Sequence, residues 1–301
     1  MKKSTIFAGT RRRVKRAFTL IEIMVATAIM VVLVGLVIQI TSQVLNVWTR
    51  SSGRLSALAS ARVAMELITQ DLETAVFRNN GMQWLNAENQ ELAAVGGTTN
   101  TVSLRLFSPA LDRPEGPGDI CGIGYLLRFA DPVTGEEAGD DRLFVLYRKI
   151  INAETTFNDL MGRENQETLD WGTWTGGTSG EGAGPDTSTT INADDYLVSN
   201  IASFEIKFFV EDDGDPGTST LVEGNTIFGG ESSTVGSGAV AASDPRYQKP
   251  LAYADIRLTV LSDEGATILQ NLEATGNTLD EVILQYSQVF YRRIYFPSRP
   301  I

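Results

Sequence analysis

The chain has 301 residues, with 25 basic and 37 acidic side chains, so its formal net charge at pH 7 is −12. It contains no histidine and one cysteine, which excludes Ser-His and Cys-His nucleophile pairs, zinc sites that use histidine, and an intrachain disulfide. We therefore expect one or two domains without enzymatic activity, although chemistry by paired carboxylates stays open.

The positive charge is concentrated at the N-terminus. Residues 1–17 contain seven basic residues and no acidic ones, which leaves 18 basic and 37 acidic residues, a net charge of −19, in the remainder. Lys and Arg next to an apolar span stay cytoplasmic, so we expect a basic leader peptide at 1–17 and a periplasmic C-terminal part. That acidic part would repel phosphates, so we do not expect nucleic acid to bind to it.

An acidic residue stands at the start of a long apolar run. The run from Ile23 to Ile40 is interrupted strongly only by Gln39, and it is long enough to span a bilayer, which takes about 20 residues. Glu22 lies at its beginning, where a carboxylate costs roughly 2.5–3.5 kcal/mol on insertion scales and usually has a functional partner. The alternative is that Glu22 lies at the headgroup level and reaches water.

The residues from Ala17 to Glu22, Ala-Phe-Thr-Leu-Ile-Glu, follow the basic cluster directly. This arrangement resembles the signal of type IV prepilins and type II secretion pseudopilins. The resemblance implies cleavage by a prepilin peptidase between Ala17 and Phe18, N-methylation of Phe18, a fit of Thr19 to the peptidase, and roles of Glu22 and Thr19 in assembly. The family usually has glycine where this chain has Ala17, a difference that bears on cleavage efficiency.

Cleavage at this bond would create an amine four residues before Glu22. In a helical filament, that amine could lie near the Glu22 carboxylate of a neighbouring subunit. Opposite charges attract strongly in a low dielectric, whereas either charge alone is costly there. An unassembled subunit would therefore carry a penalty that docking relieves.

The helix is expected to continue well beyond the apolar run, from Phe18 to Arg78, about 90 Å at 1.5 Å per residue. Residues 18–40 would form its membrane-spanning and filament-core part, and residues 41–80 an amphipathic helix. In the second part, apolar residues recur at three- and four-residue spacing, at Leu55, Leu58, Ala61, Met65, Ile68, Leu72 and Val76.

Residues 81–301 are expected to form an exported, β-rich globular domain. Alternation of β-branched or aromatic residues with polar ones predicts five strands, at Thr101–Phe107, Ile120–Phe129, Leu143–Ile150, Ile201–Val210 and Ala252–Leu261. A short helix from Leu279 to Phe290 and an extended tail would follow. The expected fold class is thus α+β and pilin-like, with the long N-terminal helix packed on an antiparallel sheet.

Two stretches rich in Gly, Ser and Thr, 172–190 and 212–243, are predicted to be long flexible surface loops. The second begins with Asp212, Asp213 and Asp215, whose clustered hard oxygens suit calcium. Some pseudopilins hold calcium in the globular domain, but a solvated acidic turn is the alternative, and no other cofactor is expected. Cys121 is predicted to be buried on a strand, with a reactive thiol as the alternative.

The leading hypothesis is a non-enzymatic pilin-like subunit of a type II secretion pseudopilus or type IV pilus-like filament. Its expected partners are the prepilin peptidase, other pilin or pseudopilin subunits, the inner-membrane assembly platform and the membrane itself. It would cross the inner membrane once and leave it on assembly. Length and layout resemble J-type minor pseudopilins or W-type minor pilins, expected at a filament tip. The tail at 292–300 also resembles prepilin-type proteins of Verru_Chthon gene cassettes.

The alternative is an exported or signal-anchored periplasmic binding protein or hydrolase that does not polymerise. Ala26-Thr27-Ala28 resembles a signal-peptidase box, but it lies in the middle of the apolar run rather than at its end. This alternative also gives Glu22 no role.

Overall fold

The computed structural model divides into two compact units, Met1–Ser51 and Ser52–Ile301. It describes residues 19–77, 84–110, 112, 117–137, 139, 141–161, 193–211, 219–222, 226–228, 251–272 and 276–296.

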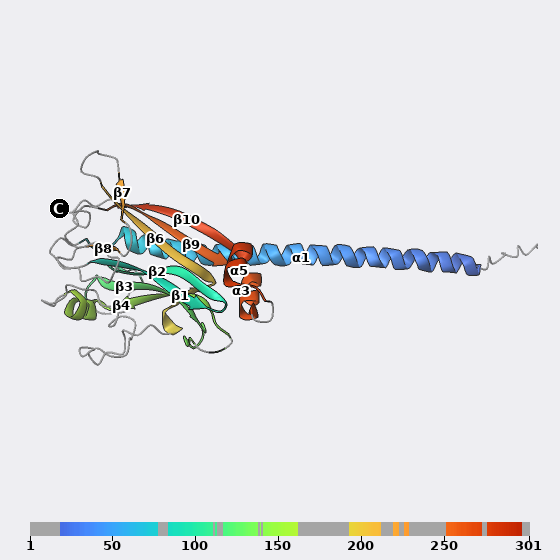
Figure 1. Cartoon of the computed structure of the whole chain (residues 1–301), viewed down its shortest axis with the longest axis horizontal. Coiled ribbons are helices and arrows are strands. Elements are labelled where there is room, and N and C mark those ends of the chain that lie inside the picture. The colour runs from blue at the N-terminus through green and yellow to red at the C-terminus, as the bar shows by residue number, and fades with distance from the viewer. Residues whose placement is uncertain are drawn as a thin grey trace, which may run out of the picture. The chain divides into compact units, whose positions relative to one another are not determined.

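The helix α1 (Leu20–Glu73) is the described secondary structure of the first unit and extends into the second (Figure 1). Every side chain from Leu20 to Thr49 is exposed, although most are apolar. A helix that is apolar all round is typical of a membrane span or of the inside of an assembly. The predicted long helix is confirmed over these residues.

The helix ends five residues before the predicted boundary at Arg78. The N–H of Val76 donates to the carbonyl of Phe107 at 2.7 Å, and the hydroxyls of Thr74 and Ser108 lie 2.6 Å apart. Bonds to a neighbouring strand therefore replace the next helical turn.

Within the second unit, α1 buries one stripe of small and apolar side chains. The predicted stripe included Leu55 and Leu58, and this part was wrong, because these side chains are 65% and 44% exposed. The predicted positions Ala61, Met65, Ile68 and Leu72 are buried, and Ala57 and Ala64 complete the stripe in place of the two leucines.

Two antiparallel sheets make up most of the second unit (Figure 1). Sheet A has the strand order β5-β4-β3-β2-β1-β8 and sheet B the order β10-β9-β6-β7. The strands of sheet A are β1 (Leu85–Ala94), β2 (Gly97–Ser108), β3 (Cys121–Ala130), β4 (Leu143–Ile151), β5 (Tyr196–Ser199) and β8 (Thr226–Phe228). Those of sheet B are β6 (Ile201–Glu211), β7 (Ser219–Val222), β9 (Leu251–Leu261) and β10 (Ser287–Tyr295).

Short helices complete the described part of this unit: α2 (Ala153–Thr155), the π-helical turn η1 (Thr156–Met161), the 3₁₀ turn η4 (Ala193–Asp195), α3 (Asp263–Gln270) and α5 (Leu279–Tyr286). The main core contains the stripe of α1 together with residues of both sheets, among them Tyr125, Phe204 and Ile256. A smaller cluster joins α3 and α5 to Phe129 and Phe144 of sheet A.

All five predicted strands are present, as β2, β3, β4, β6 and β9, and Cys121 is a buried residue of β3 as predicted. The predicted loop at 212–243 was partly wrong, because it contains β7 and β8. The C-terminal helix stops at Tyr286, since Ser287 begins the pairing of β10 with β9. The predicted loop at 172–190 lies outside the described residues.

A buried ion pair joins α1 to sheet A. The side chains of Asp71 on α1 and Arg148 on β4 are 3% and 5% exposed. Nε and Nη2 of Arg148 donate to the two carboxylate oxygens of Asp71 at 2.8 and 3.0 Å, and Nη1 donates to Asp112 at 2.6 Å. This forked geometry satisfies both charges where water is excluded.

Tyr125 on β3 completes this network. Its hydroxyl donates to Asp71 and accepts from Nε of Arg148 at 3.0 Å. Burial raises the pKa of Tyr125 well above its ordinary value, and the charge of Asp71 raises it further. Burial alone would lower the pKa of Arg148, but its hydrogen bond with Asp71 holds it above the ordinary value. Arg148 is therefore charged and Tyr125 neutral at neutral pH.

Replacing Asp71 by asparagine should destabilise the domain by about 3–5 kcal/mol, because Arg148 would lose its buried counter-charge and keep only the more exposed carboxylate of Asp112. The single thiol of the chain, Cys121, is buried, so its labelling rate in the full chain in detergent micelles reports opening of the domain. Asp71→Asn should raise that rate roughly a hundredfold or more.

Arg257→Met is the matched control, since its pair with Glu205 is long, at 3.6 Å, and partly exposed. It should cost no more than about 1 kcal/mol. The double variant Asp71→Leu/Arg148→Met should recover much of the loss. Equal labelling rates for Asp71→Asn and Arg257→Met would contradict the large contribution to stability that we expect from the buried pair.

The raised pKa values of two buried tyrosines predict how the free energy of unfolding depends on pH. The pKa values of Tyr125 and Tyr147 are both raised, in each case chiefly by burial. Above about pH 10 the unfolded chain loses protons that the folded chain keeps. Their contribution to stability is therefore complete below that pH, and it falls at higher pH by up to about 1.4 kcal/mol per pH unit for each tyrosine. Urea unfolding at stepwise higher pH measures this loss.

Two phenylalanine variants separate these tyrosines. Both should flatten the loss of stability above about pH 10. Tyr125→Phe should also lower stability at neutral pH by about 1.5–3 kcal/mol, because it removes hydrogen bonds to charged groups. Tyr147→Phe should not, since the buried Tyr147 hydroxyl has no hydrogen-bond partner among the described residues. An equal loss at neutral pH in both variants would refute this distinction.

Candidate functional site

Thr19 caps the start of α1. Its carbonyl accepts the N–H of Glu22 at 3.1 Å and that of Ile23 at 3.3 Å, and its Oγ1 accepts the N–H of Glu22 at 3.3 Å. A threonine hydroxyl in this position satisfies one of the backbone donors that a helix start leaves open. Thr19-Leu20-Ile21-Glu22 has the order Thr-x-x-Glu of a capping box. Of the two hydrogen bonds of such a box, the structure contains the one from the N–H of Glu22 to the side chain of Thr19.

Glu22 lies in the first turn of α1 and is exposed. The positive end of the helix dipole favours a carboxylate at this place. Within the described part of the chain, no side chain forms an ion pair or hydrogen bond with the Glu22 carboxylate. Glu22 therefore presents an acceptor-only group beside a surface that is otherwise apolar.

The surface around Glu22 is strongly apolar. Leu20 and Ile21 are 77% and 70% exposed, and Val31 further along is 71% exposed. α1 is the one helix among the described residues that is long and apolar enough to cross a membrane, judged by length and composition. Apolar surface of this extent marks contact with lipid or with other protein chains.

The structure brings two of the predicted site residues, Thr19 and Glu22, together in one helical turn. Ala17 and Phe18 lie outside the described residues, so the predicted cleavage bond stays a prediction. Asp212, Asp213 and Asp215 also lie outside them. Across the described ranges, no group of three or more His, Cys, Asp or Glu side chains is placed to hold a metal ion. Calcium binding by the three aspartates therefore stays a prediction as well.

Sequence reasoning missed two features of α1 for which the chain carries a signal. The spacing of Thr19 and Glu22 is that of a capping box, which indicates a helix that begins at Leu20. Asp71 lies between Ile68 and Leu72 of the apolar stripe, and a carboxylate so close to a buried row requires a cation opposite it. Nothing in the local sequence indicates that this cation is Arg148.

A comparison with known protein families finds a match at this end of the chain. Residues 12–38 match the family described as the prokaryotic N-terminal methylation motif. No curated protein and no solved structure matches the chain. The matched range includes Thr19, Glu22 and the exposed apolar turns of α1. The chain thus carries a prepilin-type methylation motif, as predicted, while the J-type or W-type assignment stays a prediction.

Proposed function

We propose that this chain is a pilin-like subunit that a prepilin peptidase cleaves between Ala17 and Phe18 and that then assembles into a filament. One observation carries the proposal: the methylation motif at 12–38 coincides with the start of a helix whose side chains are exposed and mostly apolar from Leu20 to Thr49. Such a helix needs lipid or other subunits around it. The filament would be a type II secretion pseudopilus or a type IV pilus-like fibre.

The proposed topology follows from charge and apolarity. The seven basic residues of the leader at 1–17 favour a cytoplasmic N-terminus, so residues 18–40 would cross the inner membrane once. The remainder of α1, to Glu73, and the β-rich part at 81–301 would lie in the periplasm. On assembly the subunit would leave the membrane, and the lipid contacts of α1 would be exchanged for contacts with neighbouring helices.

Glu22 supplies a reason for ordered docking. Thr19 occupies the backbone N–H of Glu22, while the carboxylate has no described partner within its own chain. After cleavage, the nearest new cation would be the amine of Phe18, and a neighbouring subunit could bring its own amine to Glu22. Pairing would neutralise both charges in an apolar environment, so a correctly placed neighbour is favoured over a displaced one.

A minor role is the more specific proposal. The second unit comprises Ser52–Ile301, and the chain has a single cysteine and thus no intrachain cystine staple. These features fit a subunit at the filament tip that primes assembly or contacts cargo. Proteins with this motif are generally structural subunits, which agrees with a non-enzymatic role.

Processing is tested by the intact mass and N-terminal sequence of the chain extracted from membranes. We expect a start at N-methylated Phe18, because the peptidase would recognise the basic leader and the Phe-Thr-Leu-Ile-Glu segment. The uncleaved variant Ala17→Leu should retain the leader and serves as the control. A start near Ile29 would indicate ordinary signal-peptidase cleavage, and an uncleaved wild-type chain a simple anchor, and either result would overturn the proposal.

Assembly is tested by replacing Glu22 with alanine. The variant should insert into the membrane and lose its leader as the wild type does, but its recovery in sheared filaments should fall at least tenfold. Gln39→Ala removes another polar side chain from the same apolar run and should assemble normally. Undiminished incorporation of Glu22→Ala would defeat the proposed role of this carboxylate.

A further inference from the structure

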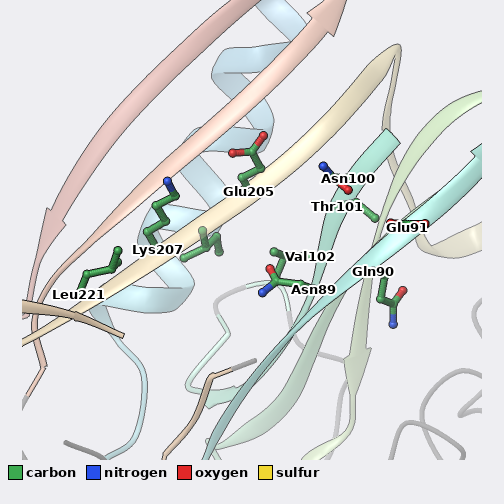
Figure 2. A pocket seen from close by; sticks show the side chains of 10 residues that line it. Asn89, Gln90, Glu91, Asn100, Thr101, Val102, Glu205, Lys207 and Leu221 are labelled. Carbon is green, nitrogen blue, oxygen red and sulfur yellow. The ribbon is translucent and has the colours of Figure 1, made fainter. Parts of the chain in front are cut away.

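A groove of about 610 Å³ opens between the two sheets of the globular unit. Residues of β1 and β2 line one side, and residues of β6 and β7 line the other (Figure 2). The sheets are tied together near one end of this groove, where the hydroxyl of Ser203 donates to the carbonyl of Asn100 at 2.7 Å. From this tie, β6 continues along the groove toward β7.

Two strands have open edges at this groove. Pairing of β6 with β7 begins at Phe208, so in the described part of the chain Ser203–Lys207 pairs with a strand only on the side of β9. Similarly, β8 pairs only with Leu85–Ala87 of β1. Among the described strands, the rest of β1, Glu88–Ala94, therefore pairs only with β2, on its other side. Open edges present backbone N–H and C=O groups that an added strand can bind.

The groove also contains polar side chains suited to a peptide backbone. Asn100 offers a carboxamide with both donors and an acceptor. Thr101 is 2% exposed, and its hydroxyl has no hydrogen-bond partner among the residues that the structure describes. The Thr101 hydroxyl is itself buried beneath the groove surface, so the backbone edges and the side chain of Asn100 are the groups that a bound segment would meet.

The two ends of the groove carry opposite charges. Glu91 pairs in register with Asn100, at the end where Ser203 ties the sheets together. Lys207 lies four residues beyond Ser203, about 13 Å along the strand. Figure 2 shows Lys207 and Leu221 toward one end and Glu91 toward the other. Glu91 has no salt bridge among the described residues. Lys207 lies opposite Asp255 of β9, but the Asp255 carboxylate is bound by Arg293 at 2.7 Å, and Glu205 between the two ends pairs with Arg257.

We propose that this groove binds an extended segment of a partner protein as an added strand, with a basic residue beside Glu91 and an acidic residue beside Lys207. Main-chain hydrogen bonds to the open edges supply affinity, and the two end charges set the direction of the bound segment. Binding in the groove requires neither cleavage at Ala17 nor filament assembly, so it goes beyond the function proposed above.

The test uses the full chain in detergent micelles and two fluorescent probe peptides about seven residues long, which span about 23 Å when extended. Both alternate valine and threonine and carry lysine and glutamate four residues apart, in opposite orders. We expect saturable binding that prefers one order, with slower hydrogen exchange at Ser203–Lys207 or Glu88–Glu91. Copies of the probes with methylated backbone nitrogens keep the side chains but lose the donors, and they should not bind.

Three variants locate the site. Glu91→Gln should reduce the preference for one probe order, without faster labelling of Cys121. Lys207→Gln should also reduce the preference for one probe order. The difference between this variant and the wild type should be smaller at high salt, because salt screens the charge of Lys207. Glu136→Gln removes an exposed charge from the connection between β3 and β4, away from the lining residues, and should change nothing.

Three results would overturn the proposal. One is the absence of saturable binding by both probes, and another is equal binding by the methylated copies. The third is binding of a neutral oligosaccharide such as a dextran fragment in place of the peptides, which would reassign the groove to carbohydrate.

Discussion

The contact between Asp71 and Arg148 constrains this structure more than any other. A buried carboxylate and a buried guanidinium each need the other, because neither can be hydrated where they lie. Sliding α1 by one residue along the sheet, or rotating it, would leave the Asp71 carboxylate unpaired in the core and Arg148 with only the more exposed Asp112. Apolar contacts alone would tolerate such shifts far better, since they are not directional. The ion pair therefore specifies the register of α1 against sheet A, with Tyr125 holding both partners.

The same helix meets two different environments along its length. From Leu20 to Thr49 its side chains are exposed and mostly apolar, so their free energy depends on what surrounds the chain. From Ala57 onward a narrow stripe of alanines and larger apolar residues is buried by the protein itself. Only the first part needs lipid or neighbouring subunits, and only the second part needs the sheets. No proline separates them, so the change lies in side chains and not in the backbone.

Periodicity predicted the elements whose residues alternate cleanly. The strands β2, β3, β4, β6 and β9 have such patterns, whereas β1 reads as polar because of Asn86, Glu88, Asn89 and Gln90. β10 was partly assigned to the preceding helix, since Val289 and Phe290 continue its apolar spacing until pairing with β9 takes over. The start of α1 and Glu22 could be predicted from a short motif. The partner of Asp71 and the groove beside Thr101 could not, because both depend on which strands tertiary folding brings together.

The core around α1 joins residues from opposite ends of the sequence. Ala61 and Ile68 are buried in the same cluster as Ile256, Leu258 and Ile294. Chains are synthesised from the N-terminus, so the buried stripe of α1 stays uncovered until nearly the whole chain has emerged. Contacts so distant in sequence also form slowly. The newly made domain therefore passes through a period in which an apolar helix face is open to aggregation.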